Sequence, residues 1–194
     1  MCYEMNRLFI EKHNAKDSKD FVLEKGYKCY SKTCSYNGSF TDFTTKANLL
    51  VSKDGKPYFA GIDLPFSLSH SGDYIVCLFS SYVCGVDIQE KREASYIEIA
   101  ERFYLRHEID YVKENGLDGF YDIWTRREAY GKMTGIGFFC DHPSFVDENL
   151  NLRSKVKYKE DLFYLLSPSK DHFRALENYS ISICSRERGI IIEE

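Results

Sequence analysis

Two stretches of the chain share one pattern, and this repetition limits the folds that the sequence can adopt. The stretch IVCLFSSYVCGVDIQE covers residues 75–90, and ISICSRERGIIIEE covers residues 181–194. Each is an apolar run, a polar turn, and a glycine followed by a second apolar run with an acidic or amide end. Short apolar runs bounded by turn residues are typical of buried strands. Unless the similarity is due to chance, the chain consists of two related halves, and Asp87 stands opposite Ile191.

Further strands are expected on both sides of this pattern. The runs at 74–79 and 83–88 follow a short apolar segment, and together they predict a tight antiparallel meander. The sequence SHSG at 69–72 is expected to form the turn that precedes it. The later apolar runs predict strands at 162–166, 179–184 and 189–192. Residues 45–51 could be a helical turn or a strand, and the residues before them show no clear periodicity.

Helices are expected between these strands. Ser95 precedes an amphipathic run and has Glu98 three residues later, which is the pattern of a capping box. A second helix is expected to end at Asn115 and Gly116. The strongest helical pattern runs over 120–133, with Gly135 placed to form a left-handed cap.

Length and composition exclude some functions. The 194 residues suffice for one sizeable domain or for two small halves that share a core. The formal net charge of −4 argues against a general nucleic-acid binder, which carries a basic excess. The seven cysteines form no CxxC pair, so we expect reduced thiols in a cytoplasmic protein. We find no signal-peptide pattern and no apolar run of about 18 residues that could cross a membrane.

Asp87 is the first candidate for chemistry. It lies within GVDI, in a strand that otherwise reads as buried. A buried carboxylate is costly unless a cation or several donors compensate it. Cation binding is therefore one interpretation, and a carboxylate that caps the turn after the strand is the other.

Trp124, Glu128 and Lys132 form the second candidate. They are spaced four residues apart, so on a helix they share one face. That face presents a carboxylate and an ammonium group side by side. An exposed Glu–Lys pair is the plain alternative, although Trp124 argues against full exposure.

Two further segments suit an anion. Ser69 and His70, in the SHSG segment, offer a hydroxyl, an imidazole and backbone N–H groups that could hold a phosphate. Lys56 stands beside a rigid proline in GKP. Both segments could equally be ordinary turns.

The order and spacing of these segments are more specific than any one of them. GKPYF, FSLSHSGDY, GVDIQE, RFYLRHEIDY and WTRREAYGKMTG follow one another between residues 55 and 135. This series resembles the signature of the 4′-phosphopantetheinyl transferases of the surfactin-synthetase-activating type. The resemblance covers somewhat less than half of the chain.

The resemblance implies an enzyme that moves the 4′-phosphopantetheine arm of coenzyme A to a serine hydroxyl of an acyl or peptidyl carrier protein. The second product is adenosine 3′,5′-bisphosphate, and the reaction depends on Mg²⁺. The implied fold is a pseudo-dimer of two similar α+β halves, 1–94 and 95–194, with the coenzyme in the cleft between them. Such a chain is expected to act as a monomer, without nucleic acid or membrane as a partner.

The resemblance also implies roles for individual residues. Asp87 and Glu128 match the metal ligands, and Glu128 also matches a group that helps to deprotonate the carrier serine. Lys132 matches a helix lysine that contacts the phosphate of coenzyme A. Ser69 and His70 match the turn that contacts phosphate, and Lys56 matches the coenzyme-binding lysine of GKP. Glu108 matches a glutamate that acts as a base.

Gln89 departs from the family pattern. Many members carry a glutamate two residues after the metal-binding aspartate, and here that position is an amide. An amide oxygen is a neutral ligand, so water could replace it on Mg²⁺. This departure keeps a second interpretation open, a weakly catalytic module that binds coenzyme A or a carrier protein.

Overall fold

The computed structural model describes residues 6–12, 18–53, 55–138, 141–168 and 174–193, and in these ranges the chain is a mixed α/β fold. Its elements in chain order are β1 (Asn6–Lys12), α1 (Ser18–Thr33), α2 (Phe40–Ala47), β2 (Leu49–Val51), β3 (Pro57–Phe59), β4 (Phe66–Ser71), β5 (Tyr74–Phe79), β6 (Gly85–Glu90), α3 (Tyr96–Phe103), α4 (Arg106–Thr134), β7 (Lys155–Tyr158), β8 (Asp161–Leu166), the 3-10 turn η2 (Arg174–Leu176), β9 (Tyr179–Ser185) and β10 (Ile190–Glu193).

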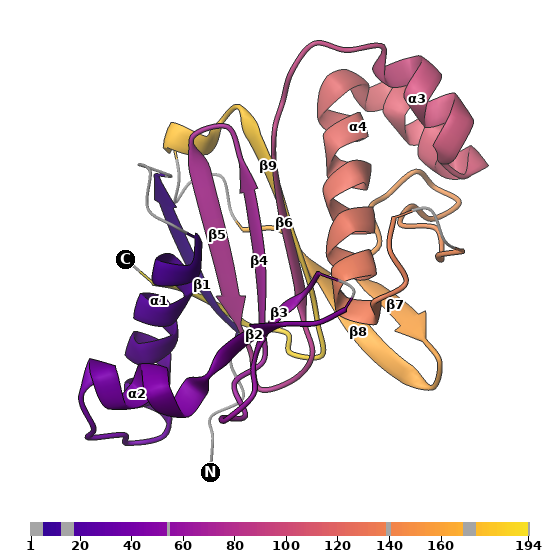
Figure 1. Cartoon of the computed structure of the whole chain (residues 1–194). Helices are drawn as coiled ribbons and strands as arrows, with labels where there is room; N and C mark the ends of the chain where they lie inside the picture. Colours follow the sequence, from indigo (N-terminus) through magenta and orange to yellow (C-terminus); the bar gives the residue numbers. More distant parts are fainter. Residues whose placement is uncertain (1–5, 13–17, 54, 139–140, 169–173, 194) are drawn as a thin grey trace.

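Two four-stranded sheets organise the described chain (Figure 1). The first has the order β10-β1-β5-β4, and the second has the order β6-β9-β8-β7. All neighbours are antiparallel except β1 and β10, which run parallel. A small hairpin of β2 and β3 stands apart from both sheets.

Three apolar layers hold these elements together. Alternate residues of β5 point to opposite faces of the first sheet, so Cys77 packs toward α1 and α2 while Val76 and Leu78 pack toward the second sheet. The middle layer also contains Val86 and Ile88 of β6. The third layer lies between the second sheet and helices α3 and α4. The helices thus cover the outer faces of two sheets that pack against each other (Figure 1).

The predicted meander is wrong in its third strand. β4 and β5 form the expected antiparallel pair, but β6 pairs with β9 in the other sheet. In this position Val86 and Ile88 are fully buried in the layer between the sheets, while the backbone of β6 pairs with β9. The predicted turn at SHSG is also wrong, because β4 continues through Ser71 and the turn begins at Gly72.

The helix predictions are largely confirmed. The helix after Ser95 forms, although the Ser95 side chain makes no capping hydrogen bond. Gly116 interrupts α4 with φ 62° and ψ −142°, where a helix end was expected. Gly135 caps α4 in the left-handed region with φ 77°, as predicted. The ambiguous 45–51 segment contains the end of α2 and the strand β2.

The repeated pattern corresponds to two crossings between the sheets. The chain leaves the first sheet after β5 and enters the second at β6, and it returns from β9 to β10. The expected boundary between the two halves, at 94/95, does not coincide with the division into sheets. β6 pairs with strands of the later half, and β10 pairs with a strand of the earlier half. That division stays a prediction.

The cysteines of the apolar runs lie inside the fold. Cys77, Cys84 and Cys184 are buried thiols, and the described cysteines form no disulfide. Burial raises the pKa of the Cys84 thiol to about 12. Cys2 and Cys140 lie outside the described residues. Among the helices that the structure describes, none is long and apolar enough to cross a membrane.

Candidate active site

Gly85 lets β6 come into close contact with α4. A Cβ atom at this position would lie only 1.8 Å from the carbonyl oxygen of Ala129. Because no other residue type fits that gap, β6 can lie directly against the helix only with glycine here. The close approach brings Asp87, two residues further along β6, within reach of the side chains of α4.

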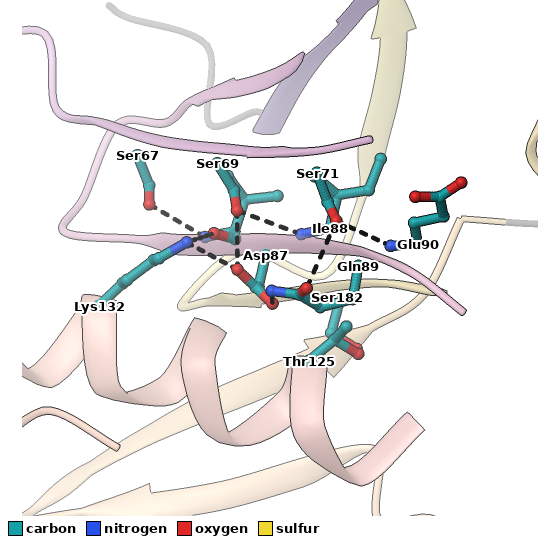
Figure 2. A network of polar contacts seen from close by, with 11 residues as sticks. Ser67, Ser69, Ser71, Asp87, Ile88, Gln89, Glu90, Thr125, Lys132 and Ser182 are labelled. Atoms are coloured by element: carbon teal, nitrogen blue, oxygen red, sulfur yellow. Dashed lines mark hydrogen bonds and ion pairs between the residues drawn. The ribbon is translucent and has the colours of Figure 1, made fainter. Parts of the chain in front are cut away.

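The Asp87 carboxylate is buried and held by three donors. Only 2% of Asp87 is exposed. Its Oδ1 atom accepts hydrogen bonds from Ser69 Oγ at 2.7 Å and from Lys132 Nζ at 2.8 Å. Its Oδ2 atom accepts from Gln89 Nε2 at 3.2 Å. Figure 2 shows these contacts converging from β4, β6 and α4. The structure therefore supplies both the cation and the donors that a buried carboxylate requires.

Glu128 lies one helical turn before Lys132 and is half-buried. Among the residues that the structure describes, its carboxylate takes part in no hydrogen bond or ion pair of its own. Burial raises the pKa of Glu128, the charge of Asp87 raises it further, and Lys132 opposes the shift. A half-buried acid beside a second acid is a group that a cation would stabilise.

A cavity of about 380 Å³ lies beside Glu128 and Lys132 of α4. The turn between β2 and β3 lines one side with Gly55, Lys56 and Pro57, and the last turns of α4 line the other with Glu128 and Lys132. Lys56 Nζ donates a hydrogen bond to the backbone carbonyl of Lys132 at 2.8 Å. Burial lowers the pKa of Lys56, and the nearby charge of Lys132 contributes to the same direction. Two lysines therefore face the cavity that Glu128 lines, and one of them, Lys132, also contacts Asp87.

The donor set fits a hard divalent cation with few protein ligands. The described residues contain no group of three or more His, Cys, Asp or Glu side chains that could hold a metal. Mg²⁺ is commonly bound by one or two carboxylates, with water and substrate phosphate oxygens completing its shell. Asp87 and Glu128 meet that requirement, and Gln89 adds an amide beside them. The ammonium group of Lys132 forms an ion pair with Asp87 at 2.8 Å.

The side chains of Ser69 and His70 have different surroundings in this structure. Since they are neighbours on β4, their side chains point to opposite faces of the strand. Ser69 is buried and faces Asp87, whereas His70 is exposed and does not line the cavity. The predicted pairing of the two at one phosphate therefore has no support from the strand geometry.

Within the described chain, Glu108 makes its hydrogen bonds with backbone N–H groups, not with the other predicted site residues. Its side chain is fully buried, with 0% exposure, at the start of α4. One carboxylate oxygen accepts the N–H of Leu105 at 3.0 Å, and the other accepts the N–H of Phe145 at 2.9 Å. Arg127 lies 3.7 Å from it. These contacts are those of a residue that caps a helix and fixes a loop, and a role as base stays a prediction.

Two serines beside Ser69 make contacts that the sequence did not predict. Ser67 and Ser71 also accept hydrogen bonds from backbone N–H groups of β6 (Figure 2). The available signal was a serine at every second position in FSLSHS, which places all three on one face of a strand. Thr125 and Ser182, whose hydroxyls are 2.8 Å apart between α4 and β9, gave no such signal.

Known proteins of one family resemble this chain. The sequence profile of the 4′-phosphopantetheinyl transferase superfamily matches residues 83–184. The 4′-phosphopantetheinyl transferase gsp of Aneurinibacillus migulanus is 32% identical over 147 residues, which cover 71% of this chain and 59% of the relative. The 4′-phosphopantetheinyl transferase Sfp of Bacillus subtilis strain 168 is 34% identical over 96 residues, covering 47% of this chain and 42% of the relative.

The profile match extends over more than half of the chain, and it includes both β6 and α4. The chain therefore belongs to the 4′-phosphopantetheinyl transferase superfamily. It spans 59% of the length of gsp and 42% of the length of Sfp.

Proposed function

We propose that this chain transfers 4′-phosphopantetheine from coenzyme A to a serine hydroxyl of an apo acyl or peptidyl carrier protein, with Mg²⁺ bound at Asp87 and Glu128. The observation that carries the proposal is that Glu128, Lys56 and Lys132 line one cavity, and that Lys132 also contacts the buried Asp87 carboxylate. Family membership and the names of the relatives support the same reaction.

The reaction needs little covalent chemistry from the protein. The serine oxygen of the carrier forms a bond to the phosphorus that bears the pantetheine arm, and the pyrophosphate P–O bond breaks. Adenosine 3′,5′-bisphosphate leaves with the bonding electrons, and the serine proton passes to a base. Transfers of this kind depend mainly on positioning and on neutralisation of the phosphate charges.

The side chains of the site match those tasks. Asp87 and Glu128 would hold Mg²⁺ with Gln89 or water beside it, and the ion would supply positive charge next to the pyrophosphate. Lys132 and Lys56, which face the cavity, would bind phosphate oxygens. Glu128 lines the cavity, so its carboxylate would also be placed to accept the serine proton.

The finer architecture belongs to the same proposal. We infer a pseudo-dimer of halves 1–94 and 95–194 with coenzyme A in the cleft between them. The two strand crossings between the sheets and the repeated pattern behind them support it. A monomer follows, because one chain then builds the whole cleft. The buried thiols agree with a reduced, cytoplasmic environment.

A weaker activity is the second candidate. Gln89 replaces an acid that many relatives carry, and the Lys132 ammonium already compensates Asp87. These two features favour a module that binds coenzyme A and turns it over slowly.

A carrier-labelling assay tests the proposal. The purified chain, Mg²⁺ and coenzyme A are incubated with a panel of apo-carriers from fatty-acid, polyketide and nonribosomal-peptide systems. Intact-mass spectrometry is expected to show the addition of one phosphopantetheine arm to at least one carrier. No mass gain on any carrier would contradict the transferase, and a gain with far less than one turnover per minute would favour the weaker activity.

A further inference from the structure

The two sheets pack face to face, and they also touch along one edge, where serine side chains of β4 contact β6. β4 is the last strand of the first sheet, and β6 is the first strand of the second. No backbone ladder joins them. An edge strand leaves a row of N–H groups without partners, and a buried N–H needs an acceptor. Here the hydroxyls of β4 are those acceptors.

The spacing of the serines matches the spacing of the N–H groups. Ser67, Ser69 and Ser71 accept from Val86 at 3.0 Å, Ile88 at 3.4 Å and Glu90 at 2.9 Å. Each serine lies 19 positions before its partner. The two strands therefore run in the same direction, and we call this row of contacts the serine seam (Figure 2).

Ser69 differs from the other two members of the seam. Its hydroxyl lies closer to Asp87 Oδ1, at 2.7 Å, than to the Ile88 nitrogen, at 3.4 Å. The hydrogen bond to the carboxylate is the charge-assisted one, and such bonds are the stronger kind. Ser71 reaches only the neutral Gln89 amide, at 3.4 Å.

The contacts of Ser69 leave no proton for a ligand. A serine hydroxyl has a single proton, and in Ser69 that proton is directed at Asp87. Only 7% of Ser69 is exposed. A phosphate contact would require the hydroxyl to turn away from a buried charge.

We propose that Ser69 is a positioning residue, which orients the Asp87 carboxylate for the metal and makes no contact with the phosphate of coenzyme A. This inference rests on the proposed metal site. It assigns the serine of the SHSG segment to the metal ligand rather than to the coenzyme. Groups that orient a metal ligand commonly change metal affinity about 10–100-fold when they are removed.

The test compares Ser69→Ala with Ser67→Ala. Both variants remove one acceptor from the seam, but only Ser69 touches Asp87. Binding of Mn²⁺ in the presence of coenzyme A is measured by electron paramagnetic resonance, and thermal unfolding is recorded for both. We expect similar losses of stability, with Mn²⁺ affinity reduced about tenfold or more in Ser69→Ala alone.

Two further variants protect the test against misfolding. Ser69→Thr keeps the hydroxyl and is expected to restore Mn²⁺ affinity. Ser69→Cys adds little volume, and its thiol is a weak hydrogen-bond donor. It is expected to lose Mn²⁺ affinity as well, and it takes the place of Ser69→Ala if Ser69→Ala does not fold.

Three results would overturn the proposed role of Ser69, and a fourth would overturn the transferase proposal alone. A raised KM for coenzyme A with unchanged Mn²⁺ affinity in Ser69→Ala would overturn it and restore the phosphate contact. Equal Mn²⁺ losses in Ser67→Ala would also overturn it, as would a wild type that does not bind Mn²⁺. If the wild type bound Mn²⁺ with the expected variant pattern but labelled no carrier, the inference would stand and the transferase would fall.

Discussion

At the scale of single residues, the candidate site depends on two acids in different states. Asp87 is compensated by Lys132, Ser69 and Gln89, whereas Glu128 has no such partners among the described residues. Replacing Glu128 with glutamine removes the charge while keeping the volume. We expect the rate of carrier labelling to fall on the order of 100-fold or more, because the proposed metal ligand and proton acceptor would be lost together.

The same substitution is expected to leave the fold intact. Burial and Asp87 both disfavour the charged form of Glu128, so a neutral side chain is not expected to lower the melting temperature. Labelling is followed by intact mass and folding by circular dichroism. A folded Glu128→Gln protein with wild-type labelling would show that the metal assignment is wrong.

Gln89 provides a test in the opposite direction. Its amide Nε2 donates to Asp87, and in Gln89→Glu a second carboxylate would face the first. We expect a lower melting temperature in EDTA, because like charges repel in a half-buried site, and a larger stabilisation by Mg²⁺ than in the wild type. An equal response to Mg²⁺ in both proteins would place Gln89 outside the metal site.

Glu108 separates a structural role from a catalytic one. Both of its oxygens accept backbone N–H groups, so Glu108→Gln would leave a donor facing a donor. A loss of about 1–3 kcal/mol in the free energy of unfolding is expected. Urea unfolding measures this loss, and labelling is compared per folded molecule. A fall in that specific rate with unchanged stability would support the base role instead.

At the scale of elements, the contact between β6 and α4 determines where the two acids meet. Gly85→Ala would force a Cβ atom against the Ala129 carbonyl, so β6 would have to move away from the helix. We expect a loss of about 1–3 kcal/mol in stability, as in other overpacked interiors, together with a loss of labelling.

Gly189→Ala is the matched control for this prediction. Gly189 occupies the equivalent place in the repeated pattern, but a Cβ atom there would meet nothing within 4 Å. The stability of Gly189→Ala is expected to stay within about 0.5 kcal/mol of the wild type. Equal losses in the two variants would contradict the close contact between β6 and α4.

Some helices and strands are predictable from the sequence, and others are not. The strand from 74 to 79 and the helix over 120–133 were predictable, because their apolar periodicity is local and continuous. Helix α1 was not, since Gly26 lies in its interior and glycine is a poor helix former. A Cβ atom on Gly26 would lie 3.0 Å from the Phe59 ring, so tertiary packing explains a residue that the local pattern disfavours.

At the scale of the whole molecule, strand pairing was the part that the sequence could not give. β6 leaves the strands that precede it and pairs with β9, about ninety residues later. Contacts at such separation depend on which apolar faces bury together, and no local pattern encodes them. The proximity of Asp87, Glu128 and Lys132 was expected, because a resemblance in order and spacing had singled them out. The contact of Ser69 with Asp87 was not expected, because it depends on the edge between the two sheets.

The most direct test of the proposed reaction measures both products at once. The chain is incubated with coenzyme A and an apo-carrier that it labels, in Mg²⁺ and in EDTA, and the holo-carrier and adenosine 3′,5′-bisphosphate are quantified together. We predict equal molar amounts of the two products with Mg²⁺, and neither product in EDTA or with Glu128→Gln. Binding of coenzyme A without either product in Mg²⁺, across the whole carrier panel, would contradict the proposed transfer.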